Sequence, residues 1–351
     1  MSRPVSSESV GVVRTVAQSR AARTVRRVRI IAVMSGLLVA LYAASLMFGQ
    51  TFYTPGEVLG VITGDFVPGA SFTVGELRLP RASMGLLAGA AFGLSGITFQ
   101  TMLRNPLASP DIVGISSGAS AAAVVAIVLL SLSETAVSVV ALAAGLLTAM
   151  LIYVLAYKDG VVGTRLILIG IGISAMLESV VAYVIVRAAS WDLQVAMRWL
   201  TGSLNGASWG EIVPLAVAFA VLAPLLLSQS RNLALMQQGD DSAVALGVRV
   251  ERTRILVILA AVGLISFATA AAGPIAFVAF MSGPIAGRIL RDGRSLMIPS
   301  ALVGALLVLA ADMLGQYAFG TRYPVGVVTG ALGAPFLVYL LVRTNRAGGS
   351  L

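Results

Sequence analysis

Few residues in this sequence can take part in chemistry, and their types exclude most enzyme reactions. The 351 residues include no histidine and no cysteine, which excludes disulfides, thiolate chemistry, imidazole metal ligands and histidine acid–base catalysis. No segment reads GxxxxGK followed by Ser or Thr, so the chain does not hydrolyse ATP by the P-loop route. We therefore expect neither an enzyme nor a cofactor or metal site in this chain.

Two carboxylates, Glu178 and Asp312, lie within long apolar runs. A carboxylate inside a membrane is costly unless it pairs with another group or faces water. We expect Glu178 to face a polar cavity. Alternatively, both residues could carry protons in an ion-coupled secondary transporter. A membrane-embedded enzyme would need clustered nucleophiles, carboxylates or metal ligands, and these groups are isolated along the chain.

Three polar segments stand between the apolar runs. Asn105, Pro106 and Leu107 form a forced turn, because proline ends a helix and biases the preceding residue towards extended backbone. The segment 229–254 is polar but helix-competent, and Asp240 or Asp241 can cap a short helix that runs through Val248. It is either a solvated connector or a docking segment for a partner.

Arg78 and Arg81 flank Leu79 and Pro80 near the start of an apolar helix. Taken alone, they anchor the helix end by snorkelling to lipid phosphates. A role in binding a partner is the other possibility.

The elements that must position these residues are membrane-spanning helices. Hydrophobic residues make up 58% of the chain and charged residues 11%, and the mean hydropathy is +0.95. A soluble globule of this composition could not cover itself with polar surface. We predict an all-α integral membrane protein of about ten transmembrane helices. They are expected near 30–49, 82–103, 112–131, 135–157, 166–189, 210–228, 255–272, 274–290, 296–315 and 324–342.

The basic residues predict the topology. The net charge is +9, and the basic residues lie at the ends of apolar runs. This placement indicates membrane orientation and not nucleic-acid binding. With ten spans and the basic tail of residues 1–29 inside, only five of the 24 basic residues lie outside: Arg78, Arg81, Arg187, Arg198 and Arg322. Both termini are therefore expected in the cytoplasm, with one polytopic domain over 30–346. A cleaved signal peptide is disfavoured because the run from Ile30 to Met47 lacks a small-x-small site.

Several segments, in order, resemble the FecCD family of ABC-importer permeases. These are LRLPR (77–81), QTMLRNPLASPDIVG (100–114), RLILIGIGISAML (165–177), WLTGSLNGASW (199–209), GDDSAVALGVRVERTR (239–254), AAGPIAFVAF (271–280), AAD (310–312) and YPVGVVTGALGAPFLVYLL (323–341). The resemblance covers nearly everything after residue 29. One departure stands out: the family usually has Pro-His or Pro-Gln where this chain has Gly283 and Pro284.

The resemblance implies a FecCD-like permease fold and a function. The chain would carry a ferric siderophore across the cytoplasmic (inner) membrane, with cobalamin or haem as alternative cargoes. Its partners would be a second FecCD-type permease, two ATPase subunits that bind ATP and Mg²⁺, and an extracytoplasmic siderophore-binding protein. A heterodimer with a related permease is favoured, although homodimers occur in the family.

The resemblance also implies roles for individual residues. Matching residues form a cytoplasmic gate, namely Asn105, Leu107, Gly163 and Thr164. Others dock the ATPase through the segment 229–254, namely Asp241, Ala243, Leu246, Gly247 and Val248. A third set docks the binding protein, namely Arg78, Arg81 and Arg322. Gln316 stands where another docking arginine of the family is expected, and Thr164 could equally be an ordinary N-cap.

Overall fold

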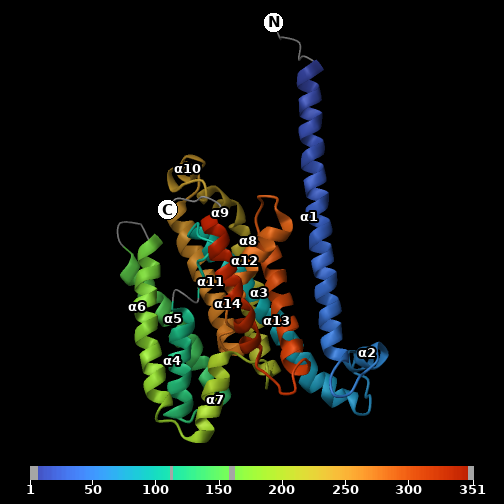
Figure 1. The fold of residues 1–351 in the computed structure, drawn as a ribbon, viewed down its shortest axis with the longest axis vertical. Helices are drawn as coiled ribbons and strands as arrows, with labels where there is room; N and C mark the ends of the chain where they lie inside the picture. The colour runs from blue at the N-terminus through green and yellow to red at the C-terminus, as the bar shows by residue number, and fades with distance from the viewer. Residues whose placement is uncertain (1–6, 111–113, 158–162, 347–351) are drawn as a thin grey trace.

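The computed structural model describes residues 7–110, 114–157 and 163–346, and within these ranges the regular elements are all helices (Figure 1). They are α1 (Ser7–Met47), α2 (Pro55–Thr63), the π-helix η1 (Ser71–Arg78), α3 (Leu79–Met102), α4 (Ile115–Val128), α5 (Glu134–Ala156), α6 (Gly163–Ile185), α7 (Ser190–Thr201), α8 (Trp209–Ser228), α9 (Ser230–Met236), α10 (Asp240–Ala245), α11 (Val250–Ala272), α12 (Val278–Leu290), α13 (Met297–Tyr317) and α14 (Val325–Arg346).

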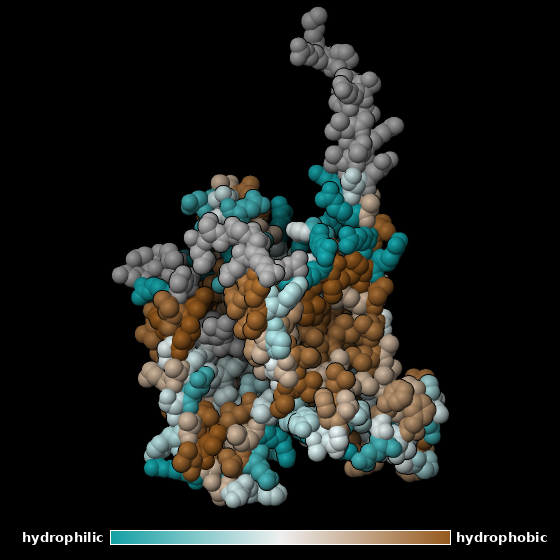
Figure 2. Space-filling view, in the orientation of Figure 1, coloured by the Kyte–Doolittle hydropathy of each residue, from teal (hydrophilic) through white to brown (hydrophobic). Residues whose placement is uncertain are grey.

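Ten of these helices correspond to the ten expected spans. Eight are long and apolar enough to cross a membrane, and α4 and α12 are shorter apolar helices. Figure 2 shows apolar residues across the middle of the molecule and polar residues towards both ends. The start of α1, the helix α10 and the end of α14 lie at one end, and α2, η1 and α7 lie at the other (Figure 1). The all-α, ten-crossing prediction is confirmed.

The helix α12 is short because non-helical backbone precedes it. Gly273 ends α11 with φ of 71°, and Phe277 stands before α12 with φ of 62°. Thirteen helical residues span only about 20 Å, less than the ~30 Å hydrocarbon core. The non-helical segment 273–277 therefore covers part of the membrane crossing that α12 leaves open. Irregular backbone at membrane depth is tolerated where protein or a cavity surrounds it.

The helix α3 is the centre of the bundle, and glycine makes its close packing possible. A Cβ at Gly93 would lie 2.2 Å from the Ser300 carbonyl oxygen of α13, and one at Gly96 would lie 1.9 Å from the Ala279 carbonyl oxygen of α12. Small residues let membrane helices approach to backbone contact. Phe92, just before these glycines, and Phe99, just after them, are fully buried.

The helix α1 runs from Ser7 through the expected tail boundary at residue 29 without a break. It stands at the side of the bundle (Figure 1). An ion pair fastens it near this boundary, since Arg27 Nη1 lies 2.7 Å from Asp292 Oδ2 in the loop before α13. Burial raises the pKa of Asp292, but the hydrogen bonds from Arg27 and from the backbone of Arg294 outweigh it and hold the pKa below its usual value.

Candidate functional site

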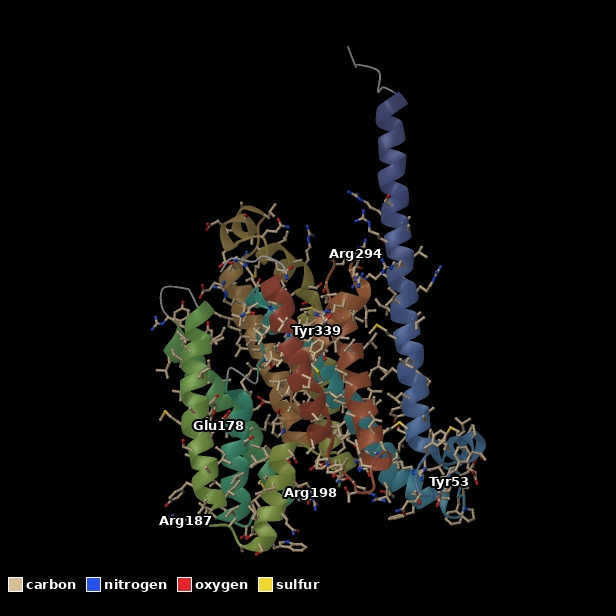
Figure 3. The ribbon with its side chains drawn as sticks, in the orientation of Figure 1. Tyr53, Glu178, Arg187, Arg198, Arg294 and Tyr339 are labelled. Carbon is tan, nitrogen blue, oxygen red and sulfur yellow. The ribbon has the colours of Figure 1, made fainter. Side chains whose placement is uncertain are left out.

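A cavity of about 680 Å³ opens among α4, α6, the segment 274–277, α12 and α14. Its polar lining consists of Glu178 of α6 and four serines, namely Ser109, Ser116, Ser117 and Ser120. Figure 3 shows Glu178 about halfway along α6, with Arg187 beyond the lower end of that helix. Glu178 does line a cavity, as expected, but apolar side chains such as Phe277, Phe280 and Leu337 make up most of the lining, so the expectation of a polar cavity is met only in part. The cavity is large enough for a small-molecule cargo, with one carboxylate and several hydroxyls as its polar groups.

An aromatic series leads from this cavity along α12 and α14. Phe277 and Phe280 line the cavity, and Phe280 meets Phe336 edge-on with ring centroids 6.5 Å apart. The Tyr339 ring follows at 6.3 Å from Phe336, and the guanidinium of Arg288 lies 4.6 Å from the Tyr339 centroid. The sequence reasoning missed this series. The signal was present as aromatic residues three apart on two segments, the spacing of one helix face.

The turn at Asn105 separates this cavity from a second one. The Asn105 Oδ1 accepts a hydrogen bond from the Leu107 N–H at 2.9 Å, and the Asn105 N–H donates to the Gln100 carbonyl at 3.0 Å. Leu107 lines the first cavity. Asn105 and Pro106 line a second cavity of about 530 Å³ among α3, α9, α12 and the loop before α13. The expected gate residues Asn105 and Leu107 therefore stand on the wall between two cavities.

Gly163 and Thr164, the other expected gate residues, open α6. The surroundings of these two residues lie outside what the structure describes, so their role stays a prediction.

The departure at Gly283 and Pro284 has a physical explanation. Proline has no N–H, so Pro284 leaves the Phe280 carbonyl, four residues earlier in α12, without its helical donor. Gln100 of α3 replaces that donor, with its Nε2 3.0 Å from the Phe280 oxygen. A Cβ at Gly283 would lie 2.1 Å from the Gln100 Oε1, so glycine makes room for this side chain. The helical hydrogen bond lost at Pro284 is thus replaced by one from Gln100 of the neighbouring helix α3.

The expected ATPase-docking segment forms a shorter helix than predicted. The helix α10 ends at Ala245, because Gly247 adopts φ of 85° and the Gly247 and Val248 N–H groups bond back to Val244 and Ala243. This pattern is a Schellman motif, whose hydrophobic contact buries Ala243 and Val248. The prediction that Ala243 is presented to a partner is therefore corrected: it holds the segment in place.

The exposed surface of this segment contains Asp241, Leu246 and Gly247 from the predicted set. It also contains Val244, which is 60% exposed and which the prediction omitted. Burial of Ala243 sets the helix orientation that turns Val244 outward.

The arginines expected to dock a binding protein differ in their surroundings. Arg78 donates to the carbonyls of Leu46, Met47 and Thr51 at 2.7–2.9 Å, and its guanidinium lies 5.0 Å from the Tyr53 ring centroid. The bonds to Leu46 and Met47 satisfy carbonyls at the end of α1. Arg78, the last residue of η1, therefore joins η1 to the end of α1.

Arg81 is also held inside the chain. Its Nε and Nη2 lie 2.7 and 2.6 Å from the two oxygens of Asp312, and its Nη1 donates to Asn205. By contrast, Arg322 is exposed. The Asp312 carboxylate, a candidate proton carrier in the rival interpretation, is thus engaged with a cation.

Comparisons with known proteins agree with this geometry. The chain matches the FecCD transport family over residues 37–343. It is 41% identical to the ferric enterobactin transport system permease protein FepG of Escherichia coli, over 86% of this chain and 92% of that one. It is 35% identical to the iron(3+)-hydroxamate import permease FhuG of Bacillus subtilis (90% and 97%) and to the cobalamin import permease BtuC of Halobacterium salinarum (87% and 78%).

A solved metal-chelate type ABC transporter in an inward-facing conformation shares the fold. The TM-score is 0.80 and the identity 26%, over 90% of this chain and 99% of that one. The family match spans the cavity, the Asn105 turn and the α10 segment. The chain is therefore a multi-pass membrane protein that belongs to the FecCD transport family.

Proposed function

We propose that this chain is a permease subunit of an ABC importer that carries ferric siderophores across the cytoplasmic membrane. The observation that carries the proposal is the cavity of Glu178, the serines and Phe277, which meets the Asn105 turn at one end. The relatives support the cargo class, because two of them are permeases for ferric enterobactin and for iron(3+)-hydroxamate.

A second FecCD-type permease completes the path. The helix α6 supports this, because few of its residues are buried within the chain and Glu178 stands on its open side. An apolar face of this size needs lipid or a partner helix against it. A heterodimer is favoured, since each of the two chains could then contribute a different wall to the cavity. A homodimer is the alternative.

Two ATPase subunits supply the energy, with ATP and Mg²⁺ bound there and not in this chain. They dock on Asp241, Val244, Leu246 and Gly247, at the cytoplasmic end. Both termini lie on that side, consistent with the common end of α1, α10 and α14. An extracytoplasmic binding protein delivers the cargo at the opposite end. Arg322 is its most accessible contact, and Arg78 and Arg81 contribute at the same end.

Uptake of radiolabelled iron tests this function. Cells that lack the gene should fail to take up ferric enterobactin or a ferric hydroxamate and recover with the gene restored. In vesicles loaded with ATP, uptake should survive collapse of the proton gradient, whereas an ion-coupled transporter would stop. Uptake of cobalamin with no uptake of iron chelates would instead favour the cargo of the halobacterial relative.

A further inference from the structure

The carboxylate of Asp240 joins three separate parts of the chain. One oxygen, Oδ1, pairs with Nη2 of Arg104 at the end of α3. The other, Oδ2, lies 2.8 Å from Nη2 of Arg254 in the first turns of α11. Asp240 is itself the first residue of α10. A single side chain therefore connects the α10 segment to two membrane-spanning helices.

The Arg104 partner is next to the Asn105 turn. Arg104 has φ of 51°, a left-handed conformation that is uncommon for a residue with a Cβ. Its N–H donates to the Thr101 carbonyl, and the next residue, Asn105, forms the bond to Leu107. The backbone of Arg104 thus passes directly into the wall between the two cavities. Any part of a shift of Arg104 that reaches its backbone is taken up by this short turn or by the end of α3.

The two ion pairs contribute little to the stability of the fold. The side chains of Arg104 and Asp240 are 43% and 44% exposed, and exposed pairs are screened by water and salt. The geometry of the two ion pairs matters for the position of α10. Because each oxygen takes a different guanidinium, the carboxylate keeps α10 at a defined position relative to both helices. The next residue, Asp241, is exposed.

We propose that Asp240 is a positioning residue, which transmits movement of the α10 segment through Arg104 to the Asn105 turn. The proposal rests on the proposed function, since it requires an ATPase on α10 and a gate at Asn105. When the ATPase moves α10, Arg104 follows Asp240, while Arg254 keeps α10 aligned with α11. The gate then opens in step with ATP hydrolysis.

The test uses the full transporter, co-purified with its ATPase, second permease and binding protein and reconstituted in liposomes. Iron uptake and phosphate release are measured together with radiolabelled ferric enterobactin. Asp240→Asn should lower the iron transported per ATP by about two- to fivefold, the scale of an exposed charge pair. Assembly and ATP hydrolysis stimulated by the binding protein should stay near wild type. Arg104→Gln should behave in the same way.

The charge reversal distinguishes a specific link from general loosening. Arg104→Asp combined with Asp240→Arg should recover most of the transport per ATP, although Arg254 then faces a cation, and adding Arg254→Asp should complete the recovery. An Asp240→Asn complex with the wild-type ratio would overturn the proposal, as would a loss of ATP hydrolysis in proportion to transport. If the wild-type complex itself moved no iron, the proposed function would fail, and that result is distinct from failure of the link.

Discussion

The helices α3 and α6 are both apolar enough to cross a membrane, but they serve different purposes. In the most apolar 18-residue stretch of the span Ser71–Met102, 83% of residues are buried, against 11% in the span Arg165–Ile185. The span that includes α3 is rich in small residues that meet neighbouring backbones. The α6 span instead presents large exposed side chains such as Ile171, Met176 and Tyr183. Hydropathy identifies the membrane spans, whereas the size of their residues distinguishes a span packed inside this chain from one whose surface is open to lipid or a partner.

The largest expected effect compares one added methyl group on each helix. Gly96→Ala places a Cβ 1.9 Å from the Ala279 carbonyl oxygen, whereas Gly172→Ala on α6 meets nothing within 4 Å. Overpacking usually costs ~1–3 kcal/mol, and a contact with backbone leaves no side chain to move away. Gly96→Ala should therefore cost more than about 3 kcal/mol. Thermal unfolding in detergent measures the loss of stability of each variant. Equal unfolding midpoints for Gly96→Ala and Gly172→Ala would show that α3 is no more tightly packed than α6.

The next effect concerns the arginine at the end of each helix. Arg81→Gln leaves the Asp312 carboxylate, only 10% exposed, without its cation. We expect a loss of about 2–3 kcal/mol, below the ~3–5 of a fully buried pair because Arg81 is partly exposed. Arg187→Gln, which removes an exposed hydrogen bond to the Tyr183 hydroxyl and a contact with the Tyr183 ring, should cost under ~0.5 kcal/mol.

A second variant gives the Arg81 prediction its control. Adding Asp312→Asn to Arg81→Gln should restore part of the lost stability, because the uncompensated charge is removed. If the double variant is less stable than Arg81→Gln alone, Asp312 has a different partner from the one described.

The same comparison explains how much was predictable from sequence. All ten spans could be predicted, because a helix that crosses a membrane needs a long apolar run. The short helices α2, α7 and α9 were not, since they lie among polar residues and tertiary contacts stabilise them. The turn at Asn105 was predictable from Pro106. The pairing of Gln100 with the carbonyl freed by Pro284 was not, because 180 residues separate the two partners.

The pairing of Gln100 offers a third, smaller test of α3 as scaffold. Gln100→Met keeps the side-chain length but leaves the buried Phe280 carbonyl without a donor. We expect a loss of about 1–2 kcal/mol in unfolding free energy. Ser179→Ala on α6, which removes a bond within the same helix, should lose under ~0.5 kcal/mol. A matching loss at Ser179 would mean that α6 is as tightly held as α3.

The smallest effect on stability is expected at Glu178, where α6 should instead affect selectivity. Its side chain is exposed and lines the cavity, and no described cation lies within ion-pair distance, so Glu178→Gln should change unfolding free energy by under ~0.5 kcal/mol. A charge across a cavity of this size acts on a charged cargo over roughly 10 Å. At an effective dielectric constant of ~20–80, this interaction changes rates by about two- to tenfold. Neutralising Glu178 should therefore raise uptake of an anionic tris-catecholate iron complex relative to a neutral tris-hydroxamate complex. Glu178→Asp, which keeps the charge, serves as the control and should leave the ratio near wild type. An unchanged ratio in Glu178→Gln would mean that the carboxylate is neutral or turned away during transport, and that the open face of α6 shapes the path without selecting charge.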